Sequence, residues 1–380
     1  MKRFFIPIIA AAFAFTGESA AQSPVNNIII MIGDGMGLSC VSMLQLENEF
    51  LPTIFDLADN IALTRTYSLN NRVTDSAAAG TALATGHKTN NTHLGLTPDG
   101  RPVESIISLA AAAGMPTGIA VTTYLQHATP AAFYAHTADR GAMEQITRSL
   151  IGSGIDVAIG GGRKYFERTY PQGAWLDTLS SRGYRVVDDI ESLASLDSRG
   201  RVMALLADKE LPYDSGGMLA AATSKMLNML DAESSARGRT GFVAMVEGSM
   251  IDYGAHGNEV EKLRGELRSF EFAVAVAVEF ARTHEGTLVV VTSDHETGGL
   301  AIASADKDFL KSEQGISYRF ACEGHTAQMC PVYLFGAGAE RINGILDNSE
   351  LGAKLIEIIA ERRQQLVSRG GATGNGRAAR

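Results

Sequence analysis

A serine that opens an alanine-rich segment is the residue of this sequence with the clearest capacity for chemistry. Ser76 follows the turn-forming residues 70–72, and residues 77–85 predict a helix that ends at Gly86. At the N-terminus of such a helix, unpaired backbone N–H groups and the helix dipole favour an anion such as phosphate. The same pattern is also typical of a simple helix cap, with Asp75 and Ser76 bonded only to backbone donors. The residues that accompany Ser76 therefore decide its role.

Acidic and histidine residues follow several predicted strands. Because the carboxyl ends of strands in an open α/β sheet meet at one edge, the loops that leave these strands should converge on one site. Each cluster taken singly also has a structural interpretation: a Gly-Asp-Gly turn, an Asp and a His four residues apart by chance, or a strand-end cap. The candidates at three strand ends and in the loop before the last strand are Asp34, Glu247, Asp252, His256, Asp294, His295 and His325.

This set contains carboxylates and imidazoles but no cysteine. Such ligands are typical of catalytic rather than structural Zn²⁺ sites, and positions that offer only oxygen suit Mg²⁺. We interpret the remaining histidines as structural. His87, His93 and His284 are expected on the surface or in loops, and His136 is expected in the core or beside the site.

The elements that must position these residues alternate along the chain. Short β-branched runs predict strands buried on both faces, and longer amphipathic runs predict helices. The alternation predicts an α/β protein, a single doubly wound domain with a large mostly parallel central sheet flanked by helices. The predicted strands are 27–32, 117–121, 156–159, 202–206, 242–246, 287–292 and 332–335, and the predicted helices are 38–58, 76–85, 103–114, 141–152, 216–233, 259–283 and 349–366.

Residues 1–21 have the pattern of a secretory signal peptide. Two basic residues precede an apolar run over residues 4–15, and small residues favour cleavage after Ala21. An N-terminal membrane anchor is the alternative, but the run is too short to span a bilayer comfortably. We therefore expect secretion to the periplasm or the exterior, a folded catalytic domain over residues 22–367, and a disordered Gly/Arg/Ala-rich tail over residues 368–380.

Composition limits the partners of this 380-residue chain. Its formal net charge of -9 disfavours binding to nucleic acid or to an anionic membrane, and no later run is long and apolar enough to be transmembrane. In an oxidising compartment Cys322 and Cys330 could pair across the loop that contains His325, which would leave Cys40 free. Three buried thiols are the alternative.

Seven segments together resemble bacterial alkaline phosphatases, and they occur in the order of that family. They are IIIMIGDGMG (28–37), VTDSAA (73–78), QHATP (126–130), HTADR (136–140), VEGSMID (246–252), TSDHE (292–296) and GHT (324–326). The resemblance implies an alkaline-phosphatase-like fold and a secreted hydrolase of small-molecule phosphomonoesters, with two Zn²⁺ ions and one Mg²⁺ ion. Family members are usually homodimers.

The resemblance also implies a role for each matched residue. Ser76 would be the nucleophile that becomes phosphorylated, and Arg140 would bind two phosphoryl oxygens while Asp75 orients it. Phosphoryl transfer needs positioning and charge stabilisation of this kind, and two metal ions can hold the attacking and leaving oxygens. The implied ligand sets are Asp34, Asp294 and His295 for one zinc, Asp252, His256 and His325 for the other, and Asp34, Thr129 and Glu247 for magnesium.

Two positions depart from the best-known bacterial pattern. His127 stands where that enzyme has an aspartate, and Tyr253 stands where it has a lysine. Both are candidates for positions beside the metal ligands. Because His127 precedes Thr129 by two residues, we expect a strand-like loop on which both side chains point toward the magnesium site. There His127 would either neighbour the ligands or bind a softer metal such as Zn²⁺ directly.

Two other functions remain open. A phosphodiesterase or another hydrolase of the same superfamily is one, although such relatives commonly use a threonine nucleophile or lack the arginine, so Ser76 and Arg140 favour monoesters. An inactive periplasmic phosphate- or metal-binding protein is the other. It would need a missing ligand or nucleophile, and none is missing from the sequence. The short segments 257–293 and 300–324 also leave little room for the insertions that form a dimer crown in some relatives.

Overall fold

A ten-stranded sheet forms the centre of the protein. The structure, a computed structural model, describes residues 24–49, 51–167, 175–213, 217–305 and 315–374. The strand order is β14-β2-β13-β8-β1-β7-β3-β4-β6-β5, and β13 alone runs antiparallel to its neighbours. The strands are β1 (Asn27–Gly33), β2 (Asn60–Arg65), β3 (Thr117–Tyr124), β4 (Val157–Gly161), β5 (Tyr184–Val187), β6 (Arg201–Leu205), β7 (Val243–Gly248), β8 (Thr287–Thr292), β13 (Cys330–Gly336) and β14 (Gly344–Asp347).

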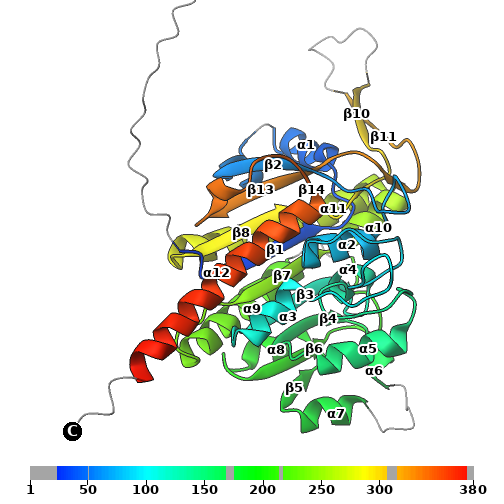
Figure 1. Ribbon diagram of the computed structural model, residues 1–380. Coiled ribbons are helices and arrows are strands. Elements are labelled where there is room, and N and C mark those ends of the chain that lie inside the picture. The colour runs from blue at the N-terminus through cyan, green and yellow to red at the C-terminus, as the bar shows by residue number, and fades with distance from the viewer. Residues whose placement is uncertain (1–23, 50, 168–174, 214–216, 306–314, 375–380) are drawn as a thin grey trace, which may run out of the picture.

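Helices lie between the strands and cover both faces of the sheet, as the alternating pattern predicted (Figure 1). Two small sheets, β10 (Ala301–Ser304) with β11 (Ile316–Arg319) and β9 (Glu296–Thr297) with β12 (His325–Thr326), lie outside the main one. The helices are α1 (Leu38–Glu47), η1 (Ile54–Leu57), α2 (Ser76–Thr85), α3 (Ile106–Ala112), α4 (Ala128–Ala131), α5 (Met143–Gly152), α6 (Arg163–Glu167), α7 (Trp175–Ser181), α8 (Ile190–Ser195), α9 (Met218–Ala236), α10 (Met250–His256), α11 (Val260–Thr283), η2 (Ala339–Arg341) and α12 (Asn348–Gly374).

Strand β1 illustrates why the central strands are apolar along their whole length. Ile28 and Ile30 join the core under α2, α3 and α12, whereas Ile29 and Met31 join the core under α9 and α11 (Figure 1). Because alternate side chains enter opposite cores, a strand buried on both faces needs an unbroken apolar run. This confirms the predicted doubly wound α/β architecture.

The predicted helix over residues 38–58 is wrong. Helix α1 ends at Glu47, and Glu49 adopts a left-handed backbone conformation with φ of 51°. Pro52 follows, and a proline disfavours helical geometry in the residue before it. The chain resumes as the short helix η1 at Ile54. The apolar periodicity therefore continues across a break that local chemistry imposes.

Other differences concern the ends of the chain and the cysteines. Helix α12 continues to Gly374, past Ser368, where the predicted tail begins; residues 375–380 and the predicted signal peptide lie outside the described residues. All three cysteines are free, so the expected pair of Cys322 and Cys330 does not form. Cys330 is buried where β13 starts, whereas Cys322 is exposed, which also contradicts three buried thiols. In the part of the chain that is described, no helix has the length and apolarity to cross a membrane.

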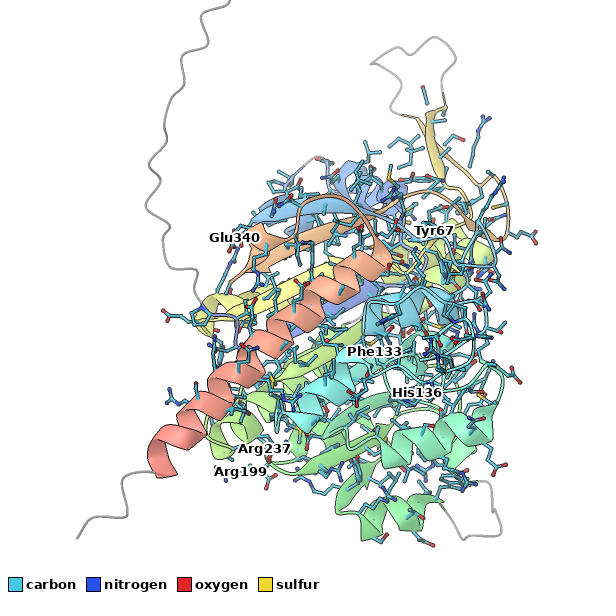
Figure 2. The ribbon with its side chains drawn as sticks, in the orientation of Figure 1. Tyr67, Phe133, His136, Arg199, Arg237 and Glu340 are labelled. Carbon is cyan, nitrogen blue, oxygen red and sulfur yellow. The ribbon has the colours of Figure 1, made fainter. Side chains whose placement is uncertain are left out.

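Different loops lie at the two ends of the parallel strands. Tyr67 and His136, from loops beyond the carboxyl ends of β2 and β3, lie toward the right in Figure 2. Arg199, Arg237 and Glu340, from loops at the opposite ends, lie toward the left. The predicted site residues follow parallel strands, so they lie at the carboxyl ends of the strands, on the same side of the sheet as Tyr67 and His136.

Candidate active site

The register of three central strands brings the predicted acidic residues together. Ile32 of β1 pairs with Glu247 of β7 and with Thr292 of β8, so the residues that follow these strands leave the sheet side by side. The chain turns sharply after Asp34 at Gly35, whose φ is 73°. A Cβ atom at Gly35 would lie 2.9 Å from the Asp252 carboxylate. The turn therefore requires glycine, and it holds Asp34 close to Asp252.

The first group of possible metal ligands is fully buried. One donor atom from each of Asp34, Asp294 and His295 lies within 4.8 Å of the others, and none of these side chains is exposed to solvent. Burial and the neighbouring carboxylates raise the pKa of Asp34 well above its ordinary value, and burial raises that of Asp294 to about 6. Burial lowers the pKa of His295 to about 4. A bound cation would favour the ionised carboxylates and so offset the cost of burying them side by side.

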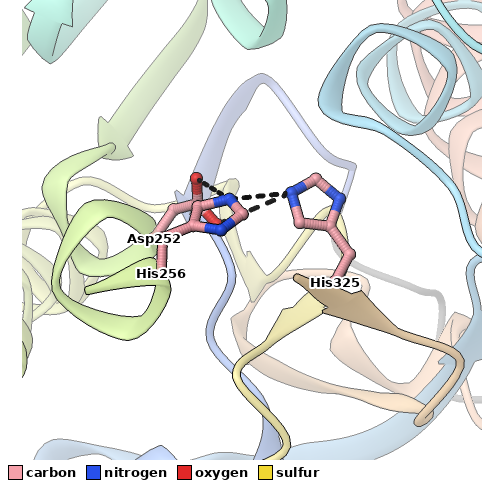
Figure 3. A group of neighbouring side chains, drawn as sticks. All are labelled: Asp252, His256 and His325. Carbon is pink, nitrogen blue, oxygen red and sulfur yellow. Dashed lines mark hydrogen bonds and ion pairs between the residues drawn. The ribbon is translucent and has the colours of Figure 1, made fainter. Parts of the chain in front are cut away.

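The second group is formed by Asp252 and His256 of α10 and by His325 of β12, which face each other across the site (Figure 3). The Nδ1 atom of His256 bonds the Glu323 carbonyl, and the Nδ1 atom of His325 bonds the Thr74 carbonyl at 2.8 Å. Because carbonyls accept only, each Nδ1 carries the proton. The Nε2 atoms of the two rings lie 3.2 Å apart, and His256 Nε2 also lies 3.3 Å from Asp252 Oδ2. Two imidazole nitrogens and a carboxylate oxygen thus converge on one point, where a cation would replace the proton on His256 Nε2.

The three side chains of this second group shift one another's pKa values. The hydrogen bond with Asp252 raises the pKa of His256 to about 9, despite partial burial. Burial alone would raise the pKa of Asp252, but the His256 hydrogen bond and three nearby imidazoles hold it below its ordinary value. Burial and His295 lower the pKa of His325. Asp252 is therefore an ionised carboxylate, the form that binds a metal.

A third group combines Asp34, His127 and Glu247. Both carboxylate oxygens of Glu247 and the Nδ1 atom of His127 are buried without a hydrogen-bond partner. Burial raises the pKa of Glu247 to about 8 and lowers that of His127 to about 3. The predicted ligand Thr129 is also buried, with Oγ1 3.4 Å from Asp34 Oδ2. Several buried polar atoms that lack partners fit a bound cation.

The expected strand-like loop around His127 is wrong. His127 is the N-cap of helix α4, and Thr129 lies inside the first turn of that helix. The two side chains reach the site from the N-cap and from the first turn of one helix instead of from one face of a strand. The rings of Tyr124 and Tyr253 pack edge-on against His127, with centroid distances of 5.3 and 6.3 Å. Burial raises the pKa of Tyr253, so its phenol remains neutral.

Ser76 lies beside the first group. It is the first residue of α2 and only 2% exposed, and its Oγ atom is 3.2 Å from His295 Nε2. Asp75 caps the helix by accepting a hydrogen bond from Ala78 N at 2.9 Å. The second oxygen of Asp75 accepts from Arg140 Nη1 at 3.1 Å. The serine hydroxyl and the arginine are thus held at the same helix N-terminus.

Thr297 is a site residue that sequence patterns did not reveal. Its hydroxyl donates to Asp252 Oδ1 at 2.6 Å and lies 3.2 Å from His295 Nδ1. A hydroxyl has one proton, so Thr297 accepts from His295, and the Nε2 lone pair of His295 is directed at Ser76. The only sequence signal was its place two residues after His295. His136, expected in the core or beside the site, is exposed and bonds the Gly95 carbonyl.

These features place three groups of possible metal ligands and a buried serine at the carboxyl ends of the strands of a mostly parallel sheet. A sequence model of the family described as alkaline phosphatase matches residues 25–318. Alkaline phosphatase 4 of Bacillus subtilis is 34% identical over 346 residues, covering 81% of this chain and 73% of that protein. The alkaline phosphatase of Escherichia coli is 30% identical over 409 residues, covering 88% and 86%.

A solved structure gives the same result. The alkaline phosphatase of the Antarctic bacterium TAB5, as a histidine-to-aspartate mutant with Mg bound in the M3 site, superposes with a TM-score of 0.81. It is 33% identical and covers 89% of this chain and 99% of its own. The chain belongs to the alkaline phosphatase family, and its activity is that of a phosphoric monoester hydrolase.

Proposed function

We propose that this protein hydrolyses small-molecule phosphomonoesters through a phosphoserine formed on Ser76, with two Zn²⁺ ions and one Mg²⁺ ion. The observation that carries the proposal is the position of the Ser76 hydroxyl. It lies 3.2 Å from His295 Nε2, in contact with the buried group of Asp34, Asp294 and His295, at the N-terminus of α2. A nucleophile, cation ligands and an anion-favouring helix end meet there.

Asp34, Asp294 and His295 would hold one zinc ion, and Asp252, His256 and His325 the other. The opposed Nε2 atoms of His256 and His325 and the mixed carboxylate-imidazole sets support zinc. When bound, zinc lowers the pKa of the serine hydroxyl and of water and neutralises phosphoryl charge. Asp34 contributes to two of the three groups, so it would bridge two ions.

Asp34, Thr129 and Glu247 would hold magnesium, because together they offer oxygen ligands in a fully buried position. The related TAB5 structure with Mg in its M3 site supports this choice. His127 would remain a neutral neighbour of the ion, since burial lowers the pKa of its imidazole to about 3. Tyr253, which packs against His127, would contribute a neutral side chain beside the same ion.

Ser76, Arg140 and Asp75 would carry out the attack on phosphorus and the binding of the phosphoryl group. The Ser76 oxygen would attack the phosphorus atom as its P–O ester bond breaks, and water would later release phosphate from Ser76. Arg140 would bind two phosphoryl oxygens with its planar guanidinium, which is 30% exposed and rests on Asp75. Asp75 would both cap the helix of the nucleophile and fix the arginine.

We also propose that the protein is secreted, with residues 1–21 as signal peptide and residues 22–367 as catalytic domain, and that it forms a homodimer. Three large apolar side chains at the β14–β2 side of the sheet support a dimer. Leu57, which precedes β2, Ile61 of β2 and Ile345 of β14 are each about half exposed, with values of 49, 54 and 57%. Light scattering should give twice the mass of one chain, and Ile345→Lys should lower it.

Hydrolysis of a chromogenic phosphomonoester beside the matching diester tests the function, with zinc and magnesium measured on the same sample. We expect the monoester to be cleaved at least a hundredfold faster, with about two zinc ions and one magnesium ion in each chain. Preferred cleavage of the diester would support the other hydrolases of this superfamily. Metal or phosphate binding without turnover would support an inactive binding protein.

A further inference from the structure

Thr92 adopts a backbone conformation that its side chain disfavours. Its φ is 74°, in the left-handed region, where β-branched residues are rarely found. The other described non-glycine residues with positive φ are Glu49, Arg239 and Asn258, none of which is β-branched. A strained conformation persists only where surrounding contacts hold it, and such residues gather at functional sites.

Thr92 connects two segments that carry catalytic groups. Its backbone N–H donates to Asp75 Oδ2 at 3.0 Å, and its hydroxyl donates to the Ala138 carbonyl at 2.8 Å. Asp75 immediately precedes Ser76, and Ala138 lies two residues before Arg140. One residue thus joins the cap of the nucleophile helix to the arginine loop.

The two bonds converge on the contact that orients Arg140. The oxygen of Asp75 that accepts from Thr92 N also accepts from Arg140 Nη1 at 3.1 Å. Two residues further on, Leu94 exchanges backbone hydrogen bonds of 2.8 and 3.0 Å with Thr137. The backbone hydrogen bonds hold the two segments together. The hydrogen bond of the Thr92 hydroxyl fixes the position of the Ala138 carbonyl, from which the chain continues to Arg140.

We propose that Thr92 is a positioning residue for phosphate binding, which acts through Arg140 and not on substrate. The proposal rests on the proposed function, because it takes Arg140 as the residue that binds phosphoryl oxygens. Without the hydroxyl, the segment from Ala138 to Arg140 is free to shift, and the guanidinium loses its alignment with both Asp75 and phosphate. Metal ligands do not depend on this contact.

Two variants separate this role from a contribution to folding alone. Thr92→Val and Thr92→Gly both remove the hydroxyl, but only glycine relieves the left-handed backbone. We expect both to raise the inhibition constant of inorganic phosphate and the KM for a phosphomonoester about two- to tenfold, the range of one hydrogen bond, while kcat stays within about twofold. The glycine variant should melt at a higher temperature than the valine variant. Thr92→Ser keeps the hydroxyl and should restore wild-type phosphate affinity.

Matched controls exist elsewhere in the chain. Arg239→Gly relieves a left-handed residue with φ of 61° far from the site, and Thr283→Val removes a hydroxyl that donates to the Glu279 carbonyl at 3.1 Å. Neither should change phosphate inhibition. The double variant Thr92→Val/Arg140→Ala should bind phosphate no more weakly than Arg140→Ala, since Thr92 acts only through the arginine.

The outcomes distinguish this inference from the proposed function. If wild-type enzyme is inhibited by phosphate and Arg140→Ala weakens that inhibition, the proposed function stands. Wild-type phosphate affinity in Thr92→Val would then overturn the role of Thr92, as would additive losses in the double variant. Phosphate affinity that follows melting temperature across the valine, glycine and serine variants would also overturn it. A wild-type enzyme without phosphate inhibition would overturn both.

Discussion

Removal of the metal ions should leave Glu247 with a contribution to stability that falls as the pH rises. Glu247 is fully buried, neither of its carboxylate oxygens has a hydrogen-bond partner, and burial raises its pKa from 4.5 to about 8. Without a cation, folded protein therefore holds this proton more tightly than unfolded protein does. The resulting stability is present at low pH and is lost as the pH rises from about 4.5 to about 8.

The size of the loss follows from this interval. The buried histidines His127 and His295 act in the opposite direction, because burial keeps them neutral in the folded state while an unfolded imidazole still titrates near 6.5. The contribution of Glu247 is therefore the difference between wild type and a variant that cannot titrate at this position. At about 1.4 kcal/mol for each pH unit, that contribution to the free energy of unfolding should fall by about 3 kcal/mol between about pH 6 and pH 8. With an entropy of unfolding near 2.1 cal/mol/K per residue, that corresponds to a Tm decrease of about 4 °C.

Differential scanning calorimetry of chelated, metal-free protein at about pH 6, 7 and 8 measures this decrease. Glu247→Gln is the matched control, because an amide of the same shape cannot titrate. Between about pH 6 and pH 8 we expect the Tm of metal-free wild type to change by about 4 °C more in the downward direction than the Tm of metal-free Glu247→Gln. Protein reloaded with Zn²⁺ and Mg²⁺ should lack this contribution, because a bound cation keeps Glu247 ionised at all three pH values. Equal pH dependence in metal-free wild type and in metal-free Glu247→Gln would refute the reasoning.

Three substitutions test individual site residues. Arg140→Ala should weaken phosphate inhibition and raise KM, because the loss of charge-assisted hydrogen bonds weakens the free energy of phosphate binding by about 1–3 kcal/mol. An unchanged inhibition constant would show that Arg140 does not touch phosphate. His127→Asp should bind Mg²⁺ more tightly and shrink activation by added Mg²⁺, because it adds a negative charge beside Asp34 and Glu247; overlapping Mg²⁺ titrations of zinc-loaded enzyme would contradict this. Thr297→Val should lower zinc affinity about 10- to 100-fold in chelator competition while Thr297→Ser retains it, and equal affinities would exclude a role for the hydroxyl.

Helix α2 was predictable from sequence because local chemistry sets both of its ends. Asp75 caps the first turn, and Gly86 ends the helix with φ of 73°, so the predicted span of 76–85 is correct at both residues. Strand β8 was predictable for a related reason: six consecutive apolar or β-branched residues form a run that is buried throughout. The strand ends then indicated where the acidic and histidine residues meet.

The strands β2, β5 and β14 were not predicted, because their local sequence does not distinguish them from loops. β5 and β14 have four residues each and form the two edges of the sheet, where burial is partial and the apolar signal is weak. β2 has residues of mixed character and pairs with strands about 270 residues further along the chain. Such pairing is a tertiary property that no short window of sequence contains.

Side-chain partnerships were also beyond the sequence. The roles of Thr92 and Thr297 depend on single hydrogen bonds to residues 46 and 45 positions away. His127 was predicted beside the acidic residues that it approaches, but on the wrong backbone, because the four-residue helix α4 is too short to leave a periodic pattern. Motifs thus indicated which candidate ligands lie together, and the fold supplied their orientation.

The identity of the phosphorylated residue tests the central claim most directly. Enzyme mixed with a phosphomonoester, quenched in acid within one turnover and digested, should yield phosphate on the peptide that contains Ser76 by mass spectrometry. Ser76→Ala should yield none and should lose several orders of magnitude in turnover, because the nucleophile is absent. Phosphate on another residue, or near wild-type turnover in Ser76→Ala, would contradict the account.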